Sequence, residues 1–211
     1  MTTAEITTAP LHTTGRNPRD PSPPATSLPR WAPAPPPVDD TSSEQMLVIC
    51  DGDAGAGDHW LRELRSRGIE PLQVRVRAPR LCAPVPVHTA EERGLTGLSQ
   101  LRRMLDTATV GLRLLVTGTE WQVLTVTAAA LECGLLRSEI RAVATSPGIS
   151  GDPVPLIVFC VHCEAETLSP AAAPGGTVTC AGCGRLLDIH PHVNSSRARY
   201  LGSDATAGEL T

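Results

Sequence analysis

Two pairs of cysteines, each with the spacing Cys-x2-Cys, impose the strongest constraint on how this 211-residue chain can fold. Cys160 and Cys163 form the first pair, and Cys180 and Cys183 form the second after sixteen intervening residues. A tight Cys-x2-Cys turn points two thiolates at one ion, and two such turns complete a tetrahedral shell. The spacing therefore predicts a four-cysteine zinc ribbon.

Iron and thiol redox chemistry are the competing uses of these cysteines. Rubredoxin-type iron sites are shielded by several aromatic rings, whereas this chain has one Phe, one Tyr and three Trp. An iron–sulfur cluster needs more room than two paired turns usually leave. A redox Cys-x2-Cys motif needs a helix N-terminus, but strand-like residues flank both pairs. Zinc is favoured, and zinc has no redox chemistry of its own.

Three histidines near the cysteines are predicted to lie outside the metal shell, because four thiolates already close it. His162 is expected to be an exposed residue of the first turn. His190 and His192, separated by Pro191, are expected to make contacts beside the site or on the surface. A catalytic zinc needs three protein ligands and an open position, and no Glu stands nearby as an obvious base. We therefore predict no catalytic residues.

The two ends of the chain are predicted to be flexible. Ten of the twenty prolines fall within the first 37 residues, where Trp31 is the sole aromatic residue. A segment this poor in packable side chains cannot offset the entropy lost on ordering, so residues 1–44 are predicted to be disordered. Residues 204–211 are predicted to form a flexible tail. The rest suits one domain of roughly 100 residues and a smaller metal-stapled module.

The segment 46–147 alternates between strand-like and helix-like hydrophobic patterns. We predict strands at 46–50, 72–77, 112–118 and 140–145, and helices at 60–69, 97–105 and 120–135. This order is typical of an α/β domain with a small parallel sheet and flanking helices. The linker 147–153 then leads to the zinc-ribbon domain at 154–203.

A glycine-rich turn at 51–57 joins the first predicted strand to the first helix, the usual place for a phosphate at a helix N-terminus. Its glycines run G-x-x-G-x-G and not G-x-G-x-x-G, the pattern of dinucleotide-binding turns. Asp51, Asp53 and Asp58 would also repel a pyrophosphate. We therefore predict no cofactor-binding residues here.

Charge and composition exclude several functions. The formal net charge is −4, which predicts no nucleic-acid partner. All 18 basic residues are Arg, so mechanisms that need a lysine nucleophile or Schiff base are excluded. The first ten residues have no signal-peptide pattern, and no stretch approaches the ~20 apolar residues that cross a bilayer. Seven cysteines, four of them in Cys-x2-Cys pairs, favour a reducing, cytoplasmic location without a membrane partner.

The α/β segment resembles a known fold family. The run 114–121 and its continuation 134–140 are similar to the last strand–helix–strand of the ferredoxin-reductase-type nicotinamide domain. Thr117-Gly118-Thr119 stands where that family has Cys-Gly-Pro. The resemblance implies a degenerate reductase-like domain that kept the fold and lost the cofactor.

The C-terminal third resembles a more specific family. F-C-V-H-C-E, C-A-G-C-G-R-L-L-D-I-H-P-H-V and S-S-R-A-R-Y-L-G are similar to the small zinc-ribbon subunit of bacterial dimethylamine monooxygenase, also described in heme-dependent oxidative N-demethylases. The resemblance covers roughly 46–205. It implies a non-catalytic subunit that works with a heme-binding monooxygenase subunit and a ferredoxin-type flavin reductase subunit. His192, Arg197, Arg199 and Tyr200 belong to the matching run and are expected to contact such a partner.

Two other functions remain open. A stand-alone NAD(P)- or flavin-dependent reductase with a structural zinc would carry bound cofactor when purified, and the poor glycine turn argues against it. A zinc-ribbon nucleic-acid-binding module would need a basic face with stacking aromatic residues. Such a face would here consist of three arginines, Arg185, Arg197 and Arg199, which is a small number for nucleic-acid binding.

Overall fold

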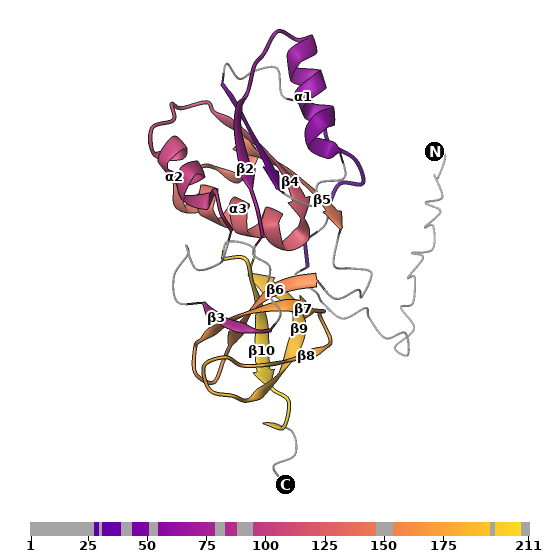
Figure 1. The fold of residues 1–211 in the computed structure, drawn as a ribbon, viewed down its shortest axis with the longest axis vertical. Coiled ribbons are helices and arrows are strands. Elements are labelled where there is room, and N and C mark those ends of the chain that lie inside the picture. The colour runs from indigo at the N-terminus through magenta and orange to yellow at the C-terminus, as the bar shows by residue number, and fades with distance from the viewer. Residues whose placement is uncertain are drawn as a thin grey trace, which may run out of the picture.

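The computed structural model describes residues 28–29, 31–38, 44–50, 55–78, 83–87, 95–146, 154–194 and 197–207. Most of the glycine-rich turn (51–54), the linker (147–153) and the last four residues lie outside this part of the chain. The described residues form two sheets with a layer of helices between them (Figure 1).

A four-stranded parallel sheet forms the first half of the molecule. Its strands, in spatial order, are β2 (Leu72–Val76), β1 (Gln45–Cys50), β4 (Arg113–Thr119) and β5 (Ile140–Ser146). All three pairings are parallel, which confirms the sheet predicted from the alternating pattern. The strand order reverses between β1 and β4, as it does in half of a doubly wound sheet.

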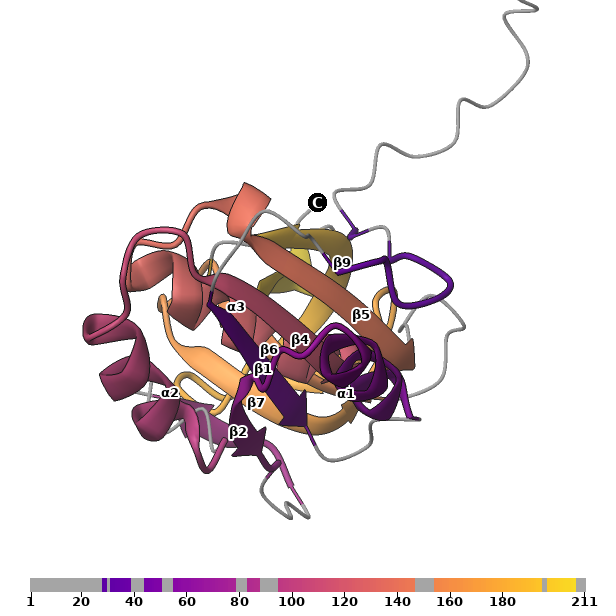
Figure 2. The same ribbon diagram turned by 90° about the horizontal axis from the view of Figure 1, so that it is seen from above.

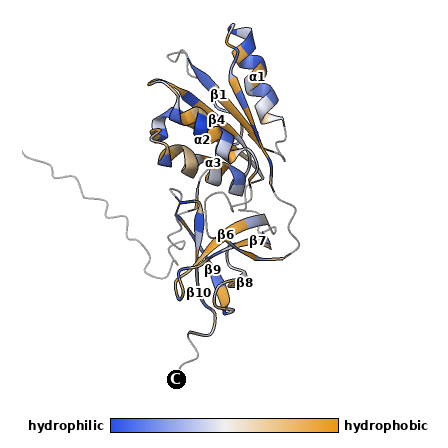
Figure 3. Ribbon diagram, turned by 60° about the vertical axis from the view of Figure 1, so that its left-hand side comes forward, coloured by the Kyte–Doolittle hydropathy of each residue, from blue (hydrophilic) through white to orange (hydrophobic). Residues whose placement is uncertain are grey.

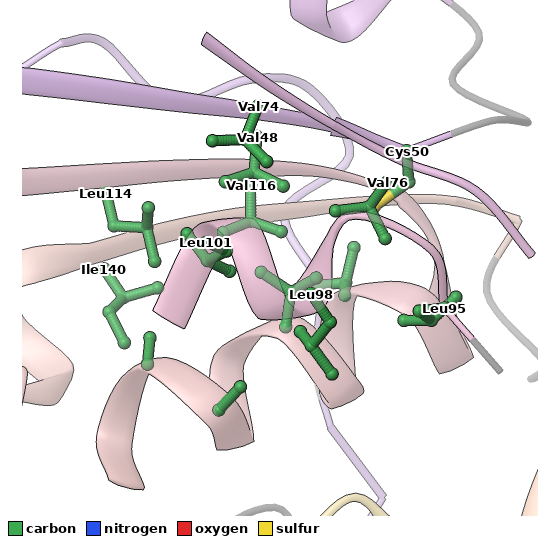
Figure 4. Close-up of a cluster of buried hydrophobic side chains, with 14 of the residues drawn as sticks. Val48, Cys50, Val74, Val76, Leu95, Leu98, Leu101, Leu114, Val116 and Ile140 are labelled. Atoms are coloured by element: carbon green, nitrogen blue, oxygen red, sulfur yellow. The ribbon is translucent and has the colours of Figure 1, made fainter. Parts of the chain in front are cut away.

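Helices cover both faces of this sheet. They are α1 (Ala56–Ser66), α2 (Leu98–Asp106) and α3 (Glu120–Glu132), and a short 3-10 helix, η1 (Arg137–Glu139), precedes β5. On β1, Leu47 and Ile49 pack with Trp60 of α1. The alternate residues of β1, such as Val48, pack with α2 and α3 (Figure 4). In Figure 2, α1 lies in front of the sheet and the strands of the second sheet lie behind it.

Most hydrophobic residues of the strands and helices lie at the positions that the fold buries. Every residue of β1 is buried, as expected for a parallel strand that is covered on both faces. Figure 3 shows β1 and β4 largely hydrophobic and α1 largely hydrophilic. On α2, Leu98, Leu101 and Leu105 recur at helical spacing and are buried.

Helix α3 lies between the two sheets and is buried on nearly every side. Ten of its 13 residues are buried, which is typical of a helix with hydrophobic side chains all round. Trp121 and Val123 pack in the cluster of the parallel sheet. Leu124 and Ala128 pack in the cluster of the second sheet. Among the described residues, no helix is long and apolar enough to span a membrane.

The junction between β4 and α3 is fixed by two residues. Gln122 accepts a hydrogen bond from the backbone N–H of Thr119 through its side-chain oxygen, at 2.9 Å, in a capping box. Gly118 has φ of +156°, and a Cβ atom there would lie 2.4 Å from Cβ of Cys50. Only glycine therefore lets β4 approach the end of β1 so closely.

A six-stranded sheet forms the second half of the molecule. Its strands, in spatial order, are β3 (Val85–Val87), β7 (Glu166–Ala172), β6 (Val154–Cys160), β10 (Arg199–Asp204), β9 (Leu186–Asn194) and β8 (Thr177–Thr179). The strand-like residues that precede the two cysteine pairs form β6 and β8. Strand β7 occupies much of the sixteen-residue spacer between the cysteine pairs and pairs with β6.

The second sheet also contains a strand that comes before the predicted domain boundary at 147–153. Strand β3 belongs by sequence to the α/β segment, yet it pairs with β7 through Val85 and Leu168 and through Val87 and Glu166. The strand has three residues, Val-Pro-Val, which are too few to show the alternation of apolar and polar residues that marks a strand. The chain therefore builds its second sheet from both predicted domains.

Residues 31–38 of the N-terminal extension contact the rest of the chain. The indole N–H of Trp60 donates to the carbonyl oxygen of Pro36 at 2.8 Å. The backbone N–H of Val38 donates to Glu63 at 3.2 Å, and the Val38 side chain is buried. Trp31 packs against the hydrophobic clusters of both sheets. These contacts join residues far apart in sequence, so composition and local pattern do not predict them.

A buried hydrogen bond ties the second sheet to α3. The hydroxyl of Tyr200 on β10 donates to Glu120 of α3 at 2.8 Å, and both side chains are 2% exposed. Burial raises the pKa of Tyr200 well above its ordinary value, and the Glu120 carboxylate raises it further. The neutral phenol is therefore the form that the fold requires.

The raised pKa predicts a loss of stability at alkaline pH. An unfolded tyrosine ionises near pH 10, whereas folded Tyr200 stays neutral, so its stabilising contribution is present below about pH 10 and falls as the pH rises further. We expect Tyr200→Phe to lower the free energy of unfolding by about 1–3 kcal/mol at pH 7 and to flatten its decline above pH 10. Urea unfolding across pH measures both effects.

Tyr200 is the single tyrosine and the chain has no lysine, so cysteine is the other side chain that titrates in this range. A Cys50→Ala variant serves as the control for thiol ionisation. Equal stability of the Tyr200→Phe variant and the wild type at pH 7 would contradict the contribution assigned to this bond.

Candidate metal centre

The two Cys-x2-Cys turns have the same backbone geometry. In the first turn, the N–H of Cys160 donates to the carbonyl of Ala165 at 2.9 Å, and the N–H of Glu164 donates to the carbonyl of Cys160 at 2.9 Å. In the second turn, the corresponding bonds join Cys180 with Arg185 at 2.8 Å and Gly184 with Cys180 at 2.9 Å. The strands β6 and β8 lead into these turns. The two cysteine pairs therefore lie in turns with the same backbone hydrogen bonds, each at the end of a strand.

The residue after each second cysteine has a left-handed backbone. Gly184 has φ of 75° after Cys183, and Glu164 has φ of 60° at the equivalent place in the first turn. A non-glycine residue in this conformation is uncommon. The first turn therefore adopts the same shape as the second without the help of glycine.

The four sulfur atoms converge on one point. The Sγ atoms of Cys160 and Cys183 are 3.9 Å apart, and those of Cys163 and Cys180 are 3.6 Å apart. All four lie within 4.8 Å of one another. A tetrahedral ion with metal–sulfur bonds of about 2.3 Å places its sulfurs about 3.8 Å apart. The spacing fits one tetrahedral ion and is too small for a cluster of several iron and sulfide ions.

The thiols interact strongly as they lose protons. Burial raises the pKa of the Cys180 thiol, but the N–H groups of Cys183 and Gly182 and the neighbouring thiols lower it to about 6. The N–H of Ala165 lowers the pKa of Cys163, but burial and the other three thiols raise it to about 12. Four thiolates this close repel one another. All four can therefore be ionised together at neutral pH when a cation lies among them.

The histidines lie apart from the sulfur cluster. Among the described residues, the one group that could hold a metal ion consists of the four cysteines. His162 is exposed on the first turn. The ring of His190 is hydrogen-bonded to the hydroxyl of Ser203 at 2.6 Å. His192 is exposed at the far end of β9.

The residues expected to contact a partner surround one hollow. His192, Arg197, Arg199 and Tyr200 line a hollow of about 230 Å³. The remaining lining residues, which the sequence patterns did not single out, are Phe159, Asn194 and Leu201. Tyr200 is the most deeply buried of the expected residues, and its hydroxyl is bonded to Glu120. Phe159 carries the one sequence signal that could have marked this place, since it is the single Phe of the chain.

The beginning of α1 borders a second hollow, of about 690 Å³. Gly55, Ala56 and His59 line one side, and Trp31 and Pro33 of the N-terminal segment line another. Asp51 and Asp53 of the glycine-rich turn lie outside the described residues. The absence of cofactor-binding residues at this turn therefore stays a prediction.

Comparison with known proteins agrees with the resemblance of the C-terminal third. Residues 157–203 match the family described as dimethylamine monooxygenase subunit DmmA-like, C-terminal domain. Over 109 residues, or 52% of this chain, the sequence is 37% identical to the heme-dependent oxidative N-demethylase delta subunit of Ectopseudomonas mendocina (strain ymp). That alignment spans 57% of the relative's length. No solved structure matches the chain. The resemblance to the DmmA-like family is confirmed.

The cluster predicts which side chains are needed for metal binding. We expect Cys180→Ser to abolish stoichiometric metal binding and to unfold the second sheet, because metal-binding energy is folding energy in such modules. His190→Ala should keep the full metal content. Metal analysis by inductively coupled plasma mass spectrometry, with circular dichroism, measures both. Equal metal loss in the two variants would overturn the assignment of four thiolate ligands.

Proposed function

We propose that this chain is a non-catalytic, zinc-binding subunit of a multicomponent oxidative N-demethylase. The match of residues 157–203 to the DmmA-like C-terminal domain is the observation that carries this proposal. The relative from Ectopseudomonas mendocina, named as a subunit of a heme-dependent oxidative N-demethylase, supports a role within a larger assembly. In this role the chain supports assembly of, or electron transfer to, a heme-binding subunit.

Zinc is the metal that we assign to the four cysteines. The sulfur–sulfur distances of 3.6 and 3.9 Å suit a tetrahedral ion bound by thiolates alone. With four protein ligands the ion keeps no open position for water or substrate, so it holds the two turns together and supplies no chemistry of its own. Oxidation of the amine would then take place on another chain.

The proposed partners are a heme-binding monooxygenase subunit and a ferredoxin-type flavin reductase subunit. Neither heme nor flavin chemistry is assigned to residues of this chain. The degenerate reductase-like character of the α/β layer and a cytoplasmic location are parts of the same proposal. A dimethylamine-like secondary amine is the proposed substrate class of the whole complex.

The nucleic-acid-binding alternative fits the observed contacts less well. Arg185 is paired with Asp204, and Arg199 is paired with Glu166, so two of the three arginines that could form a nucleic-acid-binding face are neutralised. These ion pairs favour the accessory subunit over a nucleic-acid-binding module.

The proposal predicts that activity depends on the complex. We expect the purified chain alone to show no NADPH oxidation and no amine demethylation. Co-expression with neighbouring genes for a heme oxygenase subunit and a flavin reductase should yield a complex that converts dimethylamine to formaldehyde. Formaldehyde release, measured with and without this chain, tests its contribution.

The matched control is the same complex carrying the Cys180→Ser variant, which should give less assembled complex. NADPH oxidase activity of the isolated monomer, with flavin or nicotinamide bound to it, would contradict the accessory role and favour the reductase alternative.

A further inference from the structure

The hollow lined by His192, Arg197 and Arg199 lies on the outer face of the six-stranded sheet. Side chains two residues apart on a strand share a face, so Arg199 and Leu201 of β10 lie together. Tyr200, between them, reaches the opposite side and bonds Glu120. Leu201 is directly opposite Phe159 of β6, and Arg199 is directly opposite Asn194 of β9. The register of the sheet thus places residues of β6, β9 and β10 next to one another.

The two arginines of the hollow are in different electrostatic situations. Arg199 forms an ion pair with Glu166 of β7, which holds its guanidinium in place. Its Nε atom is buried and has no hydrogen-bond partner. Arg197 is exposed, and among the described residues no carboxylate pairs with its guanidinium. The hollow therefore keeps one uncompensated positive charge, that of Arg197.

The backbone around Arg197 is held in a defined turn. The side-chain oxygen of Asn194 accepts a hydrogen bond from the backbone N–H of Arg197 at 3.1 Å. The carbonyl oxygen of Asn194 accepts from the same N–H at 3.1 Å. Ala198, the next residue, is buried with φ of 56°. Arg197 thus projects from a fixed turn beside the hollow.

The walls and the size of the hollow limit what it can hold. Phe159 and Leu201 are half-buried and give it an apolar side. Its volume of about 230 Å³ is below the ~300–1,000 Å³ of typical small-molecule pockets. Such a volume suits the side chains of one or two residues, and arginine and aromatic residues are the usual anchors of protein–protein interfaces.

We propose that this hollow binds an acidic segment of a partner protein, in which a carboxylate lies next to an apolar side chain. The carboxylate pairs with the Arg197 guanidinium in the bidentate geometry that arginine favours. The apolar neighbour packs on Phe159 and Leu201. This inference rests on the proposed function, since it requires that the chain work as a subunit, and it names the chemistry of the contact.

A charge reversal at Arg197 tests the inference. The tagged, full-length chain is co-expressed with the heme-binding and reductase subunits and captured on an affinity resin. We expect Arg197→Glu to reduce the amount of captured heme-binding subunit about tenfold or more, the effect expected when a close charge pair is lost. Arg103→Glu, the same change at an exposed position on α2, is the matched control and should capture it normally.

Metal content separates a binding defect from misfolding, because Arg197→Glu should retain stoichiometric metal. Normal capture by Arg197→Glu would overturn the inference and leave the proposed function intact. If the wild-type chain captures neither subunit, the proposed function fails and the inference fails with it.

A photo-reactive amino acid at position 192 identifies the contact directly. We expect a cross-link to a partner peptide that contains Asp or Glu beside an apolar residue. Position 186, an exposed site at the other end of β9, is the control and should not cross-link to that peptide. A cross-link from 192 to a peptide without an acidic residue, or to this chain itself, would overturn the inference.

Discussion

Repulsion among four thiolates is the constraint on which the second half of this structure depends. Sulfur atoms within 4.8 Å of one another cannot all carry charge unless a cation lies among them. The strands that end or begin at the cysteine turns, β6, β8 and β9, extend from this point. Strand β10 is tied to it as well, because the N–H of Val161 donates to the carbonyl of Gly202 at 3.1 Å. If the cysteines hold the proposed ion, metal binding and formation of the second sheet are one event.

Helix α3 connects the second sheet to the rest of the chain. It is buried between the two sheets, and its Glu120 accepts the hydroxyl of Tyr200 from the second sheet. Strand β3 crosses from the α/β segment into the second sheet, and Trp31 packs against both hydrophobic clusters. The two halves consequently hold one another in a fixed orientation. The hollow near Arg197 is thus presented on a single layered body.

Local patterns predicted much of this structure, and long-range pairing accounts for what they missed. The four cysteines follow from their spacing, and the parallel sheet follows from strand and helix periodicity. Strand β3 is three residues long and β7 contains Pro170, so neither gives a clear strand signal. The place of Pro36 depends on Trp60, 24 residues away. The hollow likewise combines Phe159 with residues some forty positions later, which only sheet register brings together.

A closed thiolate shell is what separates a structural subunit from a metalloenzyme in this account. Extended X-ray absorption at the zinc edge of the purified full-length chain measures the ligands directly. We expect four sulfur atoms at about 2.3 Å and no lighter ligand. A shell of three or fewer sulfurs with nitrogen or oxygen at about 2.0–2.1 Å would reveal an open or histidine-containing site and would contradict the assignment of a purely structural metal.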